Sequence, residues 1–276
     1  MAYDDFETMH VTSMGGVVRA VIDHPPINLL DLPLMLELDR LGRAVEEDTA
    51  AKVLVVSSAD EEFFIAHADV NLILGLPRES RSGPNDSLGF FHAMVDRFRT
   101  MPKATIAVIE GRVRGGGSEL VSSMDMRFAD IDRAVLGQPE VALGIIPGGS
   151  GTQRLPVLVG RARALEMILG CGDVDAATAE RWGWVNRAFP ARDLHAYVDE
   201  PATRVASFPS SAIATAKASA NNALPDPVVG LCAEEWLFSR TLLEPETIAR
   251  MERFLDIGGQ TREVELDLTR VYNSFS

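Results

Sequence analysis

The sequence predicts an α/β fold, and three observations carry that prediction. Apolar runs at residues 16–23, 52–58 and 104–110 have the length and the bounding turn residues of buried strands. Leucine and valine recur at helical spacing over residues 34–45, so the chain opens as strand, helix, strand. Beyond Pro156 the apolar spacing becomes mostly helical. We therefore expect an α/β core followed by a helical C-terminal part.

The elements follow one another in a simple order. The first strand is expected to stop at the prolines of His24-Pro25-Pro26, and the third runs into a glycine-rich loop, residues 111–117, with a helix beginning at Glu119. The polar segment 77–87 is the best candidate for a mobile loop. Short strands are expected at 126–129 and 134–136, and helices near 161–169, 176–181, 192–207, 210–222 and 246–257.

Composition excludes several classes of function. With 46% hydrophobic and 24% charged residues in 276, the chain has the composition of a globular protein with an ordinary core. No apolar run is long enough for a membrane span, and the acidic residues 1–10 lack a secretory signal, so a cytoplasmic location is expected. The two cysteines have no metal or redox spacing, so no metal is expected. A net charge of -14 argues against nucleic acid or an anionic membrane as a partner.

The glycine triplet 115–117 is the first candidate for chemistry. It joins a buried strand to a helix, where backbone N–H groups lack intrahelical acceptors and can stabilise an anion. The alternative is a tight turn with no further role. A nucleotide-phosphate loop is excluded, since no Lys-Ser or Lys-Thr pair follows.

Glu140 is the second candidate. It lies in a segment dense in glycine and proline, residues 137–156, and its neighbours are apolar. Burial would raise the pKa of its carboxyl group and suit it to proton transfer. The alternative is an ordinary carboxylate in a loop or at a helix cap.

Taken together, these segments resemble the enoyl-CoA hydratase/isomerase, or crotonase, family, over residues 17–222. The resemblance is specific because several separate blocks match in order. They are His24-Pro25-Pro26-Ile27-Asn28-Leu29-Leu30, residues 64–70, residues 111–120, Asp125-Met126-Arg127-Phe128-Ala129 and residues 138–156.

The resemblance implies a crotonase-like superhelix of repeated ββα units, with a catalytic core at 1–205 and a C-terminal helical, oligomerisation-associated region at 206–276. A homotrimer or a dimer of trimers is the implied assembly. Carried over by position, the backbone N–H groups of Ala68 and Gly116 form an oxyanion hole, and Glu119 and Glu140 are the paired catalytic carboxylates. Other positions implied to bind substrate are Ala66, His67, Asp69, Gly115, Pro139 and Gly148.

The implied activity is that of an enoyl-CoA hydratase, which adds water across the 2,3 double bond of an acyl-CoA thioester. Isomerases of the family typically lack the carboxylate at the Glu119 position, so the presence of both acids favours hydration. No cofactor is expected, since coenzyme A is part of the substrate. The alternatives are an isomerase, a hydratase-lyase, an acyl-CoA hydrolase, or a non-catalytic acyl-CoA-binding subunit.

Three features depart from the family pattern. His67 replaces a usual glycine, and it could crowd the turn, contact the coenzyme or titrate near the thioester. Arg114 replaces a small apolar residue. Its side chain could pair with a neighbouring acid, meet a substrate carboxylate or be solvated. Residues 247–276 do not match the family ending that helps to cover coenzyme A.

Some residues remain open between two roles. The basic side chains of Lys217, Arg81 and Arg78 could meet the coenzyme phosphates or be solvated charges. The helical spacing of Phe90, Phe91 and Met94 favours a place in the core over one in an acyl pocket, and Trp182 and Trp184 are expected to be packing residues.

Overall fold

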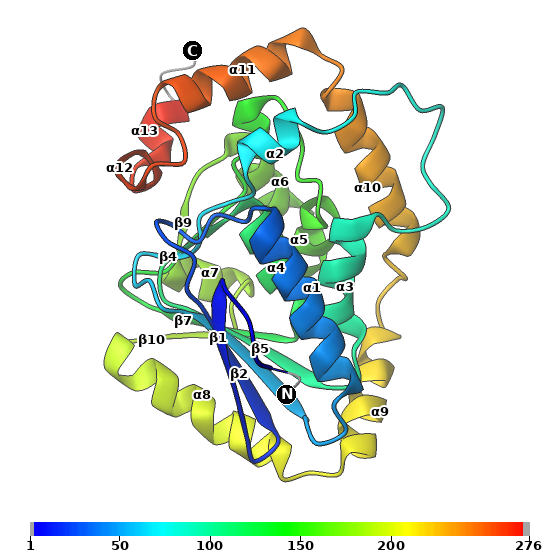
Figure 1. Ribbon diagram of the computed structural model, residues 1–276, viewed down its shortest axis with the longest axis vertical. Helices are drawn as coiled ribbons and strands as arrows, with labels where there is room; N and C mark the ends of the chain where they lie inside the picture. Colours follow the sequence, from blue (N-terminus) through cyan, green and yellow to red (C-terminus); the bar gives the residue numbers. More distant parts are fainter. Residues whose placement is uncertain (1–2, 273–276) are drawn as a thin grey trace.

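Two sheets organise the protein, as shown by a computed structural model that describes residues 3–272 (Figure 1). The expected ranges 1–205 and 206–276 therefore each extend a few residues outside the described part. The larger sheet has the strand order β1 (Met9–Met14), β2 (Val17–Ile22), β3 (Val53–Ser58), β5 (Ala104–Ile109), β7 (Met126–Asp130), β10 (Arg187–Phe189). Only β1 is antiparallel to its neighbour in this sheet.

The smaller sheet has the order β4 (Phe63–Ile65), β6 (Arg112–Arg114), β8 (Val135–Gly137), β9 (Val174–Asp175), with β9 antiparallel. The chain visits the two sheets alternately, because β3, β5 and β7 belong to the larger sheet and the strand after each belongs to the smaller one. Each strand pair is followed by helix. The expected superhelix of ββα units is confirmed.

Helices cover both faces of the larger sheet. In chain order, the helices before β10 are α1 (Leu32–Glu47), α2 (Val70–Leu74), α3 (Phe90–Thr100), α4 (Gly115–Ser123), α5 (Gly151–Val159), α6 (Arg161–Gly170) and α7 (Ala176–Trp182). One face packs against α8 (Ala191–Ala206), which runs along the lower edge of the molecule in Figure 1. The spacing of its buried Leu194, Val198, Ala202 and Ala206 is the pattern expected of a helix lying on a sheet. The other face packs against α1 and α3 in the main core.

The chain after α8 remains helical, with α9 (Ser210–Asn221), α10 (Val228–Thr241), α11 (Pro245–Asp256), α12 (Arg262–Glu265) and α13 (Leu268–Tyr272). Met251 and Phe254 of α11 pack with Leu268 against Val70 of α2 and Leu143. The C-terminal helices therefore cover the segment that follows β4. No helix within residues 3–272 is long and apolar enough to cross a membrane.

Some local expectations were wrong. The fourth helix begins at Gly115 and not at Glu119, because the glycine triplet forms its first turn. The expected glycine loop also contains strand β6, and the alternating polar segment Met9–Met14 is strand β1. Helix α5 begins within the segment dense in glycine and proline, where no helix was expected, and α10 was not expected at all.

Candidate active site

Two glutamates come from the ends of neighbouring parallel strands. Strand β6 runs directly into α4, which carries Glu119, and β8 leads to the 3-10 helix η1 (Glu140–Leu143), which begins at Glu140. The two strands pair in register through Arg114 and Gly137, so both connections leave the same edge of the sheet. Both carboxylates line one cavity of about 570 Å³.

The Glu119 carboxylate is buried and held by backbone donors. Its Oε1 atom accepts hydrogen bonds from the N–H groups of Gly149, at 2.7 Å, and Gly151, at 2.8 Å. A Cβ atom at Gly149 would lie 2.0 Å from Phe91 and 2.6 Å from Oε2 of Glu119, so only glycine lets the turn approach this closely. Glu119 also lines the cavity.

Glu140 is also buried, and its partners are different. The Gln138 amide lies against Glu140, and the orientation that satisfies its hydrogen bonds places its nitrogen 3.0 Å from each carboxylate oxygen. The backbone of Gly115, at φ +49°, passes so close that a Cβ there would lie 2.9 Å from Oε1 of Glu140. Glycine at 115 therefore serves both the turn and the position of this carboxylate.

Burial moves the two carboxyl groups away from their ordinary titration range. Burial is the largest cause that raises the pKa of Glu119, and repulsion from Glu234 is the second. Together they raise it to about 7, although the N–H groups of Gly151 and Gly149 lower it. Burial is also the largest cause for Glu140, and with repulsion from Glu119 it raises the pKa of Glu140 well above its usual value. Since the backbone donors favour the ionised form of Glu119, the last proton of the pair stays on Glu140.

The predicted oxyanion donors lie side by side in the same cavity wall. Ala68 pairs with Leu30 in a single parallel bridge, in which Leu30 N–H donates to His67 O and Asp69 N–H donates to Leu30 O. This bridge leaves the Ala68 N–H without an acceptor among residues 3–272. Gly116 is the second residue of α4, where helical N–H groups also lack acceptors. A Cβ at Gly116 would lie 3.4 Å from the Cβ of Ala68, so the two backbones are adjacent.

Apolar side chains form most of the remaining cavity wall. They include Leu72, Ile73, Phe90, Phe91, Ile146 and Phe238, with Glu79, Arg81 and Glu235 as charged members. The expectation that the phenylalanines of α3 belong to the core was wrong for Phe90, which is 47% exposed, and Phe91 also borders the cavity. Met94, Val95 and Phe98 of α3 are buried in the core, and Phe91 packs against it. The cavity therefore pairs an apolar chamber with two acids and two free N–H groups.

Comparison with known proteins agrees with this geometry. The family model for enoyl-CoA hydratase/isomerase matches residues 12–255. The chain belongs to the enoyl-CoA hydratase/isomerase family. The crotonase-like fold and the sequence resemblance are thus both confirmed.

Individual members of the enoyl-CoA hydratase/isomerase family are similar over most of the chain. A Streptomyces avermitilis crystal structure, named "putative enoyl-CoA hydratase", has 39% identity and a TM-score of 0.88, covering 98% of each chain. A "Probable enoyl-CoA hydratase" of Rhizobium meliloti is 35% identical over 220 residues, 79% of this chain and 83% of its own. The "Crotonyl-CoA hydratase" of Syntrophomonas wolfei is 34% identical over 200 residues, 72% and 75% of the two chains.

The remaining positions that the family pattern predicted to bind substrate differ in their surroundings. Gly148 lines the cavity, against the ring of Phe238. Ala66 is buried in a small apolar cluster, and Asp69 caps α2 and contacts the Gln260 side chain. Gly115 and Pro139 flank the two glutamates without being among the residues that line the cavity. Their substrate contacts stay a prediction.

His67 is buried in an ion pair. Its Nδ1 lies 2.7 Å from the carbonyl oxygen of Ala68, and its Nε2 lies 2.9 Å from Oε1 of Glu265 on α12. Both ring nitrogens thus face acceptors, which requires a proton on each. Burial alone would lower the pKa of His67, but attraction and hydrogen bonding by Glu265 outweigh it and raise that pKa. His67 thus has a structural role, since it joins the C-terminal segment to the turn that carries the Ala68 N–H.

Replacement His67→Gln should destabilise the fold, because it leaves the Glu265 carboxylate buried without its cationic partner. We expect a loss of about 3 kcal/mol in the free energy of unfolding, measured by urea denaturation. His10→Gln is the control, since His10 has a 75% exposed side chain, and it should change that energy by less than about 0.5 kcal/mol. Equal effects of the two substitutions would contradict a structural ion pair.

The ion pair also has a defined pH range. The folded pKa of His67 is raised, so its contribution is complete below the ordinary value of 6.5 and is lost as pH rises through the folded pKa. The folded pKa of Glu265 is lowered, so its contribution is complete above the ordinary value of 4.5 and is lost as pH falls through the folded pKa. The stability gap between the parent and His67→Gln should therefore be largest between these two values.

Arg114 is not solvated, although the sequence left that role open. It is 1% exposed and forms a bidentate pair with Asp173, at 2.7 and 2.6 Å. It also donates to the carbonyl oxygen of Glu265, at 2.9 Å. Arg114 thus pairs with an acid, one of the roles foreseen, and helps to hold α12 in place.

The three candidate phosphate ligands do not gather at one place. Lys217 pairs with Asp125 at 2.9 Å, in another hollow. Arg78 donates to a carbonyl oxygen on the exposed side of α2, and only Arg81 borders the cavity. Trp184 is fully buried and Trp182 half-buried, as expected for packing residues.

Two buried residues near the site were missed by sequence reasoning. Glu234 of α10 and His92 of α3 are 1% and 2% exposed, and their side chains lie 3.0 Å apart. The signal for Glu234 was an adjacent acidic pair, Glu234-Glu235, within an otherwise apolar stretch. The position of Glu234 depends on the packing of α10 against α5, which no local pattern in the sequence indicates.

Proposed function

We propose that this member of the family is an enoyl-CoA hydratase, which adds water across the 2,3 double bond of an acyl-CoA thioester. The supporting observation is one cavity that holds two buried carboxylates, Glu119 and Glu140, beside the N–H groups of Ala68 and Gly116. Relatives of 34–35% identity that carry hydratase names support the same choice. The acid at position 119 favours hydration over isomerisation.

The chemistry requires charge to move onto the thioester oxygen. When the oxygen of water bonds to Cβ, the double-bond electrons shift through Cα to the carbonyl and form an enolate. In the proposed reaction, two N–H donors stabilise that oxygen by roughly 3 kcal/mol each. The enolate then collapses as Cα takes a proton, and the product is a 3-hydroxyacyl thioester.

The two carboxyl groups divide the proton transfers by their pKa values. Glu119 is the easier of the two to ionise, so it takes the proton that the attacking water loses. Glu140 keeps its proton to higher pH and delivers it to Cα. After product release a proton must pass from Glu119 to Glu140, directly or through solvent, to restore the starting state.

This division predicts the pH dependence of the rate. Glu119 acts only when ionised, so kcat/KM should fall as pH drops through about 7, the raised pKa of this carboxyl group. Activity should fall again at high pH, when Glu140 loses its proton. Initial rates on crotonyl-CoA, measured from about pH 5.5 upward, give the acid limb first and then the alkaline limb. An acid limb near the ordinary glutamate value would contradict the assignment.

The function itself is tested with a panel of acyl-CoA thioesters of different chain length. A hydratase removes the absorbance of the conjugated thioester of a 2-enoyl-CoA. Conversion of a 3-enoyl-CoA, release of an aldehyde from an aromatic substrate, or release of free coenzyme A would identify the isomerase, hydratase-lyase or hydrolase instead. Binding without turnover on any member would indicate an acyl-CoA-binding subunit.

Assembly and location are part of the same proposal. We propose a homotrimer or a dimer of trimers, in the cytoplasm, with no cofactor beyond the coenzyme A of the substrate. An apolar hollow of about 830 Å³ beside α9, with exposed Val157 and Leu224 at its border, supports association with further copies. Sedimentation equilibrium measures the assembly directly, and a monomer at micromolar concentration would contradict it.

A further inference from the structure

The turn at residues 149–152 presents four successive N–H groups to two different carboxylates. The groups alternate, so that the first and third point to Glu119 and the second and fourth to Glu234. The distances are 2.7 Å from Gly149 and 2.8 Å from Gly151 to Glu119, and 2.6 Å from Ser150 and 2.9 Å from Thr152 to Glu234. The turn is therefore clamped between an acid of α4 and an acid of α10.

Glu234 is fully buried and well supplied with donors. Besides the two N–H groups, its carboxylate accepts from the Thr152 hydroxyl, and it lies 3.0 Å from Nε2 of His92. It provides the N-terminal cap of α5 from another helix, because Ser150 at the cap position makes no side-chain cap bond. Such a set of contacts explains how a carboxylate can remain buried at this place.

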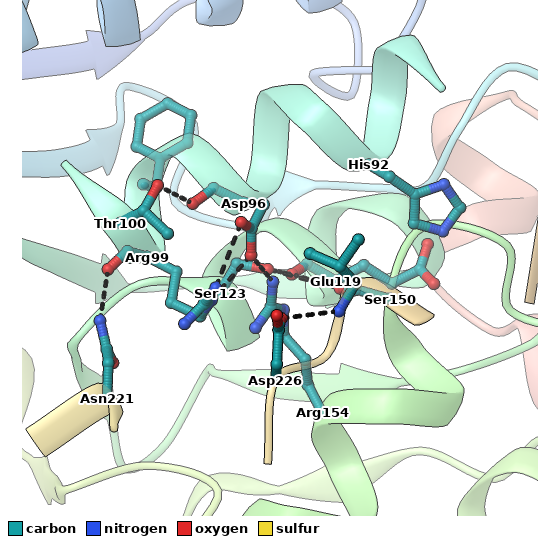
Figure 2. A network of polar contacts seen from close by, with 12 residues as sticks. His92, Asp96, Arg99, Thr100, Glu119, Ser123, Ser150, Arg154, Asn221 and Asp226 are labelled. Atoms are coloured by element: carbon teal, nitrogen blue, oxygen red, sulfur yellow. Dashed lines mark hydrogen bonds and ion pairs between the residues drawn. The ribbon is translucent and has the colours of Figure 1, made fainter. Parts of the chain in front are cut away.

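The turn that Glu234 holds is itself strained. Ser150 has φ 116°, a conformation that costs a non-glycine residue of order 1–3 kcal/mol and persists only when its surroundings impose it. Figure 2 shows the neighbouring supports, in which Arg154 of α5 contacts Asp96 of α3 at 2.8 Å and the Ser123 hydroxyl donates to the Glu119 carbonyl oxygen at 2.8 Å. These contacts fix the backbone around the turn, whereas Glu234 binds its N–H groups.

We propose that Glu234 is a positioning residue, which holds the 149–152 turn so that Gly149 and Gly151 keep the Glu119 carboxylate aimed into the cavity. The proposal rests on the proposed hydratase function of that cavity. Glu234 does not line the cavity, so it acts on the reaction through Glu119.

The charge of Glu234 adds a second, measurable effect. After burial, repulsion from Glu234 is the largest cause that raises the pKa of Glu119, and His92 of α3 acts in the opposite direction. The other charged groups that face Glu234 are Glu140 of η1 and Arg154 of α5. Next to it on α10, Glu235 pairs with Arg81 and lies 3.9 Å from the other ring nitrogen of His92. Replacing the Glu234 carboxylate with an amide should lower the pKa of Glu119, and removing the His92 imidazole should raise it.

The test compares Glu234→Gln, His92→Gln and a surface control, Glu200→Gln, whose side chain is 68% exposed. In Glu234→Gln we expect kcat on crotonyl-CoA to fall about tenfold with KM nearly unchanged, and the acid limb to move down by about one pH unit. In His92→Gln the acid limb should move up. The control should match the parent in both respects.

Several outcomes would overturn the proposal. One is an unchanged kcat in Glu234→Gln. Another is a lower kcat in that variant with the acid limb of its pH profile at the same pH as in the parent. If Glu234→Gln does not fold, His92→Gln decides, since an unmoved limb in that variant contradicts the pairing. If the parent shows no turnover, the hydratase function fails separately. The pKa of Glu119 is then measured by infrared titration of its carboxyl band. The band is assigned from the difference between each protein and its Glu119→Gln version. If the pKa of Glu119 is not lower in Glu234→Gln than in the parent, the proposal is overturned.

Discussion

Glu140→Gln is expected to lower kcat/KM for the hydration of crotonyl-CoA about a thousandfold. The substitution keeps the size of the side chain and removes the proton that Glu140 retains to high pH and delivers to Cα. Its neighbour Gln138 can rotate its amide to pair with the new amide, so the surroundings should hold. Steady-state rates measured by the loss of the conjugated-thioester absorbance give the size of the effect.

Two further measurements make the Glu140 result specific. Exchange of the Cα proton of butyryl-CoA with deuterated water should disappear in Glu140→Gln, because that exchange needs an acid-base group at Cα. Glu166→Gln on the exposed side of α6 should behave as the parent in both assays. A Glu140→Gln variant that retains a tenth or more of the parent rate would refute the role of Glu140 as the proton donor.

Glu119→Gln is expected to reduce hydration by a similar factor, about a thousandfold, for a different reason. The amide oxygen of glutamine can still accept from Gly149 and Gly151, so the turn should keep its shape. The variant lacks the base that takes the proton from water. Loss of the Glu119 charge also removes a cause that raises the pKa of Glu140, so Glu140 ionises more easily.

The two variants should therefore separate in the exchange assay. Glu119→Gln should still exchange the Cα proton of butyryl-CoA, at a rate equal to or above that of the parent, while Glu140→Gln should not. Loss of exchange in both variants would show that the carboxylates do not divide the proton transfers in this way. Thermal unfolding of both variants checks that their folds are intact.

Much of the fold could be predicted because it depends on local pattern. The buried strands β3 and β5 are continuous apolar runs, and the ends of α6, α8 and α11 fall within one residue of their expected positions. The start of α4 was missed, because glycine has the weakest helical preference of the non-proline residues and only the connection from β6 makes three of them helical. Helix α10 was missed because its apolar residues show almost no helical periodicity.

The site was predictable only where chemistry and local order coincide. Glu119 and Glu140 follow strand ends that a parallel sheet brings together, so the matching blocks located them. Glu234 and His92 are far apart in sequence, and no local signal joins them to the turn at 149–152. The role of His67 depended in the same way on Glu265, almost 200 positions later in the chain, in the segment that departs from the family pattern.

Product analysis in water enriched in the heavy oxygen isotope shows most directly whether Glu119 and Glu140 add water to a conjugated acyl-CoA thioester. Crotonyl-CoA should gain the mass of one labelled water, with the label at Cβ and the thioester intact. Label on a free carboxylate with release of coenzyme A, or an acyl chain of unchanged mass, would contradict it.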